Sequence, residues 1–306
     1  MIKPCLTDHT VKKNCIVTYI PDNDKYIDEL KTLIKNIEIE KIYENSDLII
    51  FTRKTSLDRI NSIINNSFCK VYESIDIIDD PSWYGTIYGD YYKFVNSLLF
   101  FKYKHVFTNY KYIFKTDTDV FLTPKFNELN IENNVIYVGT GKYSNDNIIN
   151  QLTKISVALK IPYSGITNVG ATWYGNSELI IKLCEKSYIY TKYIFKDFEN
   201  NLKSTGSWPK WWQGTSSMYG SELAINELCN LNKVKVEFVE FDHPSSSSNL
   251  ISSVYHIHCY HDDVFFCKFR KEEYNKIKLS TIHNKNIIKD YCLYIYLQRD
   301  SPNIVI

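Results

Sequence analysis

The sequence lacks the segments that would carry a chain into or across a membrane. Residues 1–5 contain no apolar stretch of the kind that forms the centre of a signal peptide. No apolar run approaches the length that crosses a bilayer. We therefore expect a soluble protein with no membrane span and a cytoplasmic location.

Several other signatures are also missing. Lys and Arg number 36 and Asp and Glu number 35, so the net charge of +1 gives no reason to expect a nucleic-acid partner. None of the eight cysteines stands in a Cys-x-x-Cys pair, which argues against a zinc ribbon or a thioredoxin-like motif. A Gly-rich phosphate loop is absent as well. No internal repeat is visible, and the oligomeric state stays open.

The first third of the chain predicts an α/β fold. Apolar runs at 15–20, 47–52 and 69–72 are typical of buried strands. Between them, segments 26–37 and 57–64 place apolar residues at helical spacing. Strands that alternate with helices indicate a central, mostly parallel sheet flanked by helices.

The length of 306 residues favours one large domain with elaborated loops. We expect a core of about 14–270 and a C-terminal extension, 271–306, that packs on it as a helix and a strand. Further strands are expected at 135–139, 167–175 and 234–239.

One stretch, residues 112–122, carries the clearest chemistry. An apolar run ends in Asp117 and Asp119, and a second apolar run follows directly. Burial of both runs places the two aspartates at the carboxyl end of a strand, where open α/β sheets bind ligands. Two carboxylates held together there repel each other, and Mg²⁺ or Mn²⁺ is the usual remedy. The alternative is a solvated turn with two ordinary acids.

Other candidates lie on both sides of this stretch. Lys93 interrupts an apolar helix at 91–101; if it is buried it needs an anion such as a diphosphate, and otherwise it reaches the surface. Gly170, in the strand at 167–175, predicts a close approach of a ligand or of another backbone. Trp208, Trp211 and Trp212 form a loop that either packs over the core or offers a platform for a sugar or a base.

The last third adds an acid and a histidine cluster. Glu222 lies near the expected start of a helix at residue 219, where it is either functional or a helix-dipole acid. His256 and His258 share one face of an expected strand, so either could complete a metal site with the aspartates. An ordinary hydrogen-bonded role remains open for each.

Taken in order, these motifs resemble those of GT-A fold glycosyltransferases. The set comprises the Lys93 helix, Asp117-x-Asp119, Asn168-x-Gly170, Gly220-x-Glu222 and a late histidine. It is most similar to the glycogenin-like and bacterial galactosyltransferase families, with a looser likeness to uncharacterised glycosyltransferases of large DNA viruses and algae. The likeness covers roughly residues 14–262.

The resemblance implies a role for each position. Asp117 and Asp119 would hold Mn²⁺ or Mg²⁺ on the diphosphate of a nucleotide sugar, with His258, or else His256, as third protein ligand. Lys93 would contact the phosphate or the sugar of the donor, and Asn168 would face the sugar. Independently of the resemblance, we also expect Gly170 and Trp212 to contact the donor. Glu222 falls where those families place a glutamine or an acid beneath the anomeric carbon, which favours retention of configuration.

We therefore expect a metal-dependent hexosyltransferase that moves a sugar from a nucleotide-diphosphate donor, a UDP-hexose, to a glycan or protein acceptor. A non-catalytic glycan-binding or nucleotide-sugar-binding module is the alternative. A metal-dependent nucleotidyltransferase is a third hypothesis, against which the missing phosphate loop argues.

Overall fold

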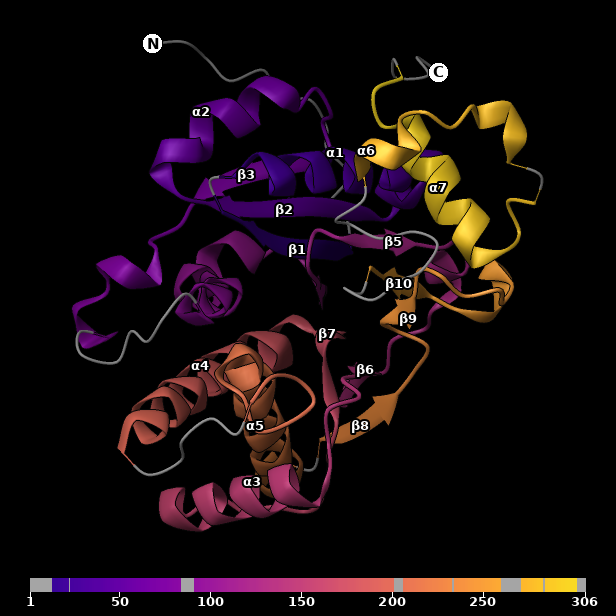
Figure 1. The fold of residues 1–306 in the computed structure, drawn as a ribbon. Coiled ribbons are helices and arrows are strands. Elements are labelled where there is room, and N and C mark those ends of the chain that lie inside the picture. Colours follow the sequence, from indigo (N-terminus) through magenta and orange to yellow (C-terminus); the bar gives the residue numbers. More distant parts are fainter. Residues whose placement is uncertain are drawn as a thin grey trace, which may run out of the picture.

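A computed structural model describes residues 13–21, 23–83, 91–200, 206–232, 234–259, 271–282 and 284–301. Its centre is a seven-stranded sheet in the order β3-β2-β1-β4-β7-β6-β8 (Figure 1). The strands are β1 (Asn14–Ile20), β2 (Ser46–Thr52), β3 (Cys69–Glu73), β4 (Tyr112–Lys115), β6 (Val135–Thr140), β7 (Val169–Asn176) and β8 (Lys235–Phe238). Only β7 runs against its neighbours β4 and β6. The predicted α/β sheet, mostly parallel and flanked by helices, is confirmed.

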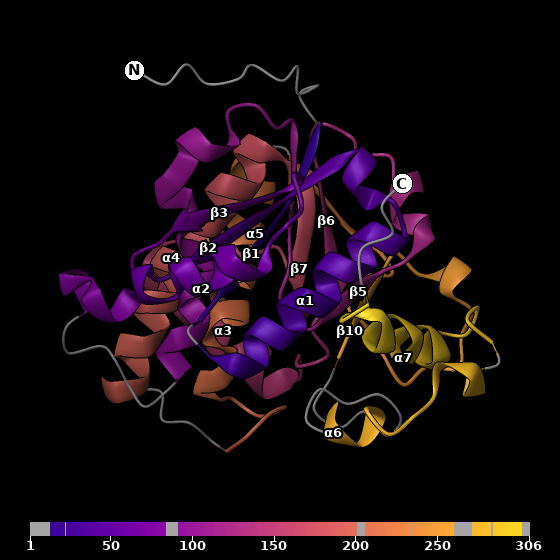
Figure 2. The same cartoon turned by 90° about the horizontal axis from the view of Figure 1, so that it is seen from above.

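Helices cover both faces of this sheet (Figures 1 and 2). The α-helices are α1 (Asp24–Ile39), α2 (Lys54–Ile63), α3 (Asp146–Leu159), α4 (Ser177–Asn200), α5 (Ser216–Asn232), α6 (Lys271–Tyr274) and α7 (Ile288–Gln298). The 3₁₀ segments are η1 (Ile42–Glu44), η2 (Ile77–Asp79), η3 (Pro81–Trp83), η4 (Tyr91–Phe107), η5 (Pro124–Glu128), η6 (Gln213–Thr215), η7 (Ile251–Ser253) and η8 (Leu279–Thr281). No helix among the described residues is both long enough and apolar enough to span a bilayer.

The strands are apolar because both of their faces are buried. Every residue of β2 is buried, and alternate side chains enter two different cores. Ile49 and Phe51 join the core that also contains apolar residues of η4, α4 and α5. Leu48 and Ile50 join the core under α1, whose Leu30 and Leu33 are fully buried. The sheet is therefore held rigidly from both sides.

A second, smaller sheet packs beside the first in the order β5-β10-β9. Its strands are β5 (Val120–Leu122), β10 (His256–His258) and β9 (His243–Pro244). The C-terminal residues lie against it, because α7 contributes Tyr291 and Ile295 to a third apolar cluster with Phe121 of β5. No strand occurs in 271–282 or 284–301, so the predicted C-terminal strand is wrong for that described part.

One edge of the large sheet is the place where the parallel strands end. The carboxyl ends of β1, β2, β4 and β6 meet at this edge, and the antiparallel β7 begins there. Ligands bind at this edge in open α/β sheets. The predicted functional residues on or next to β4, β7 and β10 can therefore lie close together at this edge.

Candidate active site

The segment with Asp117 and Asp119 follows β4 directly, as predicted. All four residues of β4 are buried, and the main chain continues to pair with β1 through the Thr116 amide, which donates to the Val17 carbonyl at 3.1 Å. Between the aspartates, buried Thr118 donates its hydroxyl to Oε2 of Glu29 on α1 at 2.9 Å. This anchor directs Thr118 toward α1 and leaves both aspartates on the other side of the loop.

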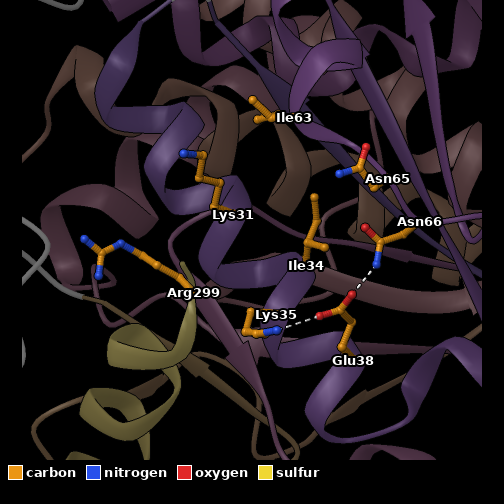
Figure 3. Close-up of a pocket in the computed structure, with 8 residues that line it drawn as sticks. All are labelled: Lys31, Ile34, Lys35, Glu38, Ile63, Asn65, Asn66 and Arg299. Carbon is orange, nitrogen blue, oxygen red and sulfur yellow. Dashed lines mark hydrogen bonds and ion pairs between the residues drawn. The ribbon is translucent and has the colours of Figure 1, made fainter. Parts of the chain in front are cut away.

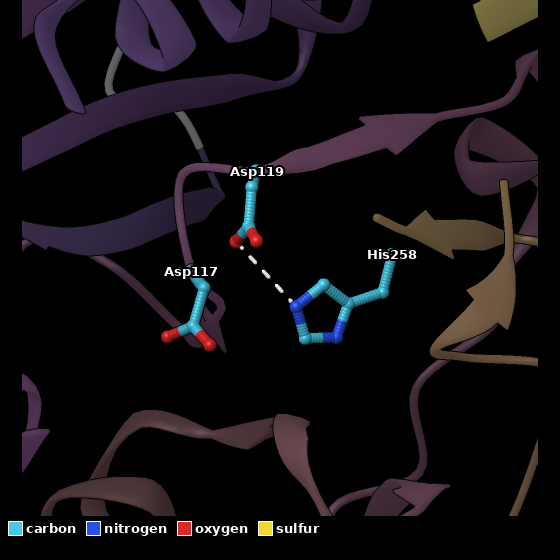
Figure 4. A group of neighbouring side chains, drawn as sticks. All are labelled: Asp117, Asp119 and His258. Atoms are coloured by element: carbon cyan, nitrogen blue, oxygen red, sulfur yellow. Dashed lines mark ion pairs between the residues drawn. The ribbon is translucent and has the colours of Figure 1, made fainter. Parts of the chain in front are cut away.

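The pairing of β5 with β10 brings a distant histidine to the aspartates. The register sets His258 opposite Val120, and the Cys259 amide donates to the Asp119 carbonyl at 3.0 Å. In Figure 4 the His258 ring faces the carboxylate of Asp119, and Asp117 lies beside Asp119. Nε2 of His258 is 3.4 Å from Oδ1 of Asp119.

These three side chains fit a divalent cation. One ligand atom from each of Asp117, Asp119 and His258 lies within 4.8 Å of the others. Ligand atoms of one octahedral ion are roughly 3–4.2 Å apart, so small side-chain rotations bring the three onto one ion. Carboxylate oxygens suit Mg²⁺ and Mn²⁺, and an imidazole nitrogen favours a transition metal such as Mn²⁺.

A second carboxylate stands behind His258. Oδ1 of Asp242 is 3.5 Å from Nδ1 of His258, so the ring lies between Asp242 and Asp119. Burial alone would lower the pKa of His258, but the charges and hydrogen bonding of Asp119 and Asp242 outweigh it and raise the pKa to about 10. The positive charge of the His258 imidazolium thus offsets the negative charges of Asp119 and Asp242. A bound cation would offset these charges instead, and His258 would release a proton.

His256 is not placed as a metal ligand, although the sequence left it as an alternative. It is fully buried and lies outside the Asp117, Asp119 and His258 cluster. Its Nδ1 accepts from the Asp242 amide at 3.0 Å, so Nε2 carries the proton that bonds Thr116 Oγ1 at 2.9 Å. Burial lowers the pKa of His256 to about 4 against the opposing charge of Asp242, so the ring is neutral.

Glu222 is a fully buried carboxylate rather than an exposed one. It lies well inside α5, because this helix begins at Ser216 and not near residue 219 as the sequence suggested. Oε1 accepts from the Tyr163 hydroxyl at 2.6 Å, and Oε2 accepts from the Tyr143 hydroxyl at 2.7 Å and the Asn168 amide at 2.6 Å. Burial raises the pKa of Glu222 above its usual 4.5 despite these hydrogen bonds.

Asn168 and Gly170 lie at the start of β7, at the same edge. Asn168 has a left-handed backbone, with φ of 67°, and its Oδ1 accepts from the Tyr143 amide at 2.8 Å. A Cβ added to Gly170 would lie 2.6 Å from Oδ2 of Asp242 and 2.7 Å from the Gly139 carbonyl carbon. The close approach that the glycine predicted is therefore to the protein's own chain, and donor contacts at both residues remain predictions.

The buried lysine of this region is not Lys93. Lys93 is exposed on η4, so the surface alternative describes it. Lys115, the last residue of β4, is buried instead; its Nζ donates to the Ala171 carbonyl at 2.9 Å and lies 4.9 Å from the centre of the Trp173 ring. The sequence did not single out Lys115, because it directly follows an apolar run and gives no sign there that its side chain is buried.

The three tryptophans of the loop differ in their surroundings. Trp211 is buried and stacks between Tyr219, with ring centres 4.5 Å apart, and Phe198, at 5.0 Å. Trp208 is 46% exposed, and Trp212 is half-buried with its ring against Gly214. The loop is thus part core and part exposed aromatic surface, and the donor contact of Trp212 remains a prediction.

A separate hollow of about 70 Å³ lies beside α1 (Figure 3). Its cations already pair with acids: Lys35 with Glu38 at 3.1 Å, Lys31 with Asp300 at 4.0 Å, and Arg299 with Asp28 at 2.9 Å. Each of these cations therefore has an acidic partner, and we assign the hollow no function.

Comparison with solved structures identifies the fold as GT-A-like. The galactosyltransferase LgtC, solved in complex with donor and acceptor sugar analogues, is 10% identical, with a TM-score of 0.50 over 85% of this chain and 94% of that chain. An active-site mutant of LgtC is 9% identical, with a TM-score of 0.53 over the same shares. Core-mannan synthase A of Aspergillus fumigatus, in a Mn/GDP form, is 10% identical, with a TM-score of 0.40 over 77% and 74%.

No protein of curated function matches the sequence. One family model does, and it covers residues 8–304. Its description is "Domain of unknown function (DUF7164)", and the chain belongs to that family.

Proposed function

We propose that this protein is a divalent-metal-dependent glycosyltransferase that uses a nucleotide-diphosphate sugar, with a UDP-hexose as the expected donor. The observation that carries the proposal is the cluster of Asp117, Asp119 and His258 at the ligand-binding edge of a GT-A-like sheet. Solved structures with this fold include glycosyltransferases that bind donor and acceptor sugars, which supports the same class of reaction here.

Asp117, Asp119 and His258 would hold Mn²⁺ or Mg²⁺ at the donor diphosphate. Bound there, the cation supplies Lewis-acid stabilisation of the negative charge on the departing diphosphate. The protein's own contribution is orientation: the Glu29 anchor fixes the loop through Thr118, and the pairing of β10 with β5 fixes His258. Such preorganised groups avoid reorganisation at the moment of reaction.

We further propose that configuration is retained. Among the described residues around the metal cluster, Asp117 and Asp119 belong to the cluster, while Asp242 and Glu222 are buried. None of these four carboxylates is suited to deprotonate an acceptor on the far side of the sugar. The acceptor hydroxyl would then bond to the anomeric carbon on the face where the bond from that carbon to the diphosphate breaks, and its proton would pass to an oxygen of the departing phosphate. Glu222 acts in this proposal as a positioning residue that fixes Asn168, and not as a nucleophile.

The test is release of nucleotide from a panel of UDP-, GDP- and other activated sugars, with Mn²⁺, with Mg²⁺ and with EDTA. We expect turnover with one donor class in Mn²⁺ and its loss in EDTA. Asp119→Asn should reduce turnover at least 100-fold, because the cation loses an anionic ligand, whereas Asp58→Asn, at an exposed site on α2, should leave it unchanged. Full activity of a folded Asp119→Asn protein would refute the proposal.

The same panel tests the alternative of a non-catalytic binding module. The exposed Trp208 is the observation that favours it, since indole rings stack on sugars. A module would bind a glycan or a nucleotide sugar in EDTA and release no nucleotide under any condition.

A further inference from the structure

We propose that Asp242 is a positioning residue that fixes the ring of His258, and thereby sets the affinity of the Asp117, Asp119 and His258 cluster for a divalent cation. This inference deepens the proposed function and rests on it. In the sequence, Asp242 gives no sign of such a role, because Asp, His and Pro in succession are typical of a turn.

Asp242 is held in place from three directions. It is only 4% exposed and immediately precedes β9, which pairs with β10 so that Ile257 stands opposite His243. Its amide donates to Nδ1 of His256 at 3.0 Å, and its Oδ1 accepts from the Thr172 hydroxyl at 2.6 Å. The carboxylate therefore has a fixed position relative to β7 and β10.

The fixed carboxylate selects the orientation of His258. Oδ1 of Asp242 lies 3.5 Å from Nδ1 of His258, on the side of the ring opposite to Asp119. With Nδ1 directed at Asp242, Nε2 faces the two aspartates of the cluster. A carboxylate bonded to the second nitrogen of a metal-ligating histidine fixes the tautomer and raises the basicity of the ligating nitrogen.

Two strands leave room for this carboxylate by having glycine where other residues would fill the space. An added Cβ would lie 2.0 Å from Oδ2 of Asp242 at Gly139 and 2.6 Å from it at Gly170. Neither Gly139 on β6 nor Gly170 on β7 has a positive φ, so backbone conformation does not explain either glycine. Space for Asp242 explains Gly139, and at Gly170 the carboxylate and the Gly139 main chain, whose carbonyl carbon would lie 2.7 Å away, both exclude a Cβ.

The experiment measures Mn²⁺ affinity without any sugar, by calorimetry and by electron paramagnetic resonance, in wild type, Asp242→Asn and Thr172→Val. Asp58→Asn on α2 serves as the surface control. Asparagine keeps the shape of the side chain and tolerates the left-handed backbone of residue 242, whose φ is 55°. We expect Asp242→Asn to weaken Mn²⁺ binding by about 10- to 100-fold. Thr172→Val should weaken it less, because Asp242 stays but loses one anchor.

A second readout separates positioning from a general loss of structure. Pulsed electron paramagnetic resonance detects an imidazole nitrogen bound to Mn²⁺; at saturating Mn²⁺ this signal should be present in wild type and in Asp58→Asn, and reduced in Asp242→Asn. If wild type binds Mn²⁺ with this signal and Asp242→Asn matches it in affinity and in signal, the role of Asp242 is refuted. If wild type itself binds no Mn²⁺, the proposed metal site fails.

Discussion

The hydrogen bond between Thr118 and Glu29 gives the sharpest stability prediction. Thr118 stands between the two aspartates, and its hydroxyl donates to Oε2 of Glu29 at 2.9 Å with both residues buried. Thr118→Val keeps the branched shape but removes the donor. Hydrogen bonds to carboxylates contribute about 1.5–3 kcal/mol, so the free energy of unfolding should fall by that amount. Mn²⁺ affinity should also fall, because the loop that carries Asp117 and Asp119 loses its anchor to α1.

The assay is urea unfolding followed by tryptophan fluorescence, with stability taken from linear extrapolation. Thr118→Ser is the matched control, because serine keeps the hydroxyl and loses only one methyl group. It should retain Mn²⁺ affinity and lose about 1 kcal/mol or less. Equal stability and equal Mn²⁺ affinity in Thr118→Val and Thr118→Ser would refute the reasoning.

Two further predictions concern buried polar groups. Burial raises the pKa of Glu222 in the folded protein above 4.5, so the free energy of unfolding of wild type should fall as the pH rises above 4.5. Glu222→Gln lacks this ionisation, so its stability relative to wild type should improve between pH 4.5 and 7.5 in urea unfolding. A stability difference that does not depend on pH would contradict this. Tyr291 on α7 donates its hydroxyl to the Leu122 carbonyl of β5 at 2.6 Å, so Tyr291→Phe should lower the free energy of unfolding by about 1–3 kcal/mol. The control Tyr294→Phe should have little effect. Equal losses in the two variants would show that the Tyr291 hydroxyl does not stabilise β5.

The sequence predicted those parts of the fold that depend on local pattern. Apolar runs predicted the buried strands β1, β2 and β4. As the sequence indicated, Asp117 and Asp119 come shortly after the end of β4. Lys93 shows the limit of such patterns, because an apolar helix at 91–101 does not reveal which side is covered, and Lys93 proved to be exposed.

The sequence also did not predict which strands far apart in the chain pair with each other. His258 meets Asp119 only because β10 pairs with β5, and residue types alone do not distinguish His258 from His256. The structure separates them through hydrogen bonds: both nitrogens of His256 have protein partners, while Nε2 of His258 faces Asp119. Asp242 was missed for the same reason, since its contacts come from β6, β7 and β10 and leave no local signature beyond two strand glycines.

One divalent cation should bind to Asp117, Asp119 and His258. Anomalous diffraction from crystals soaked in Mn²⁺ and UDP would locate it. We expect a manganese peak bounded by these three side chains, at about 2.0–2.6 Å from their ligand atoms. A peak at any other protein site, with these side chains unchanged, would contradict it.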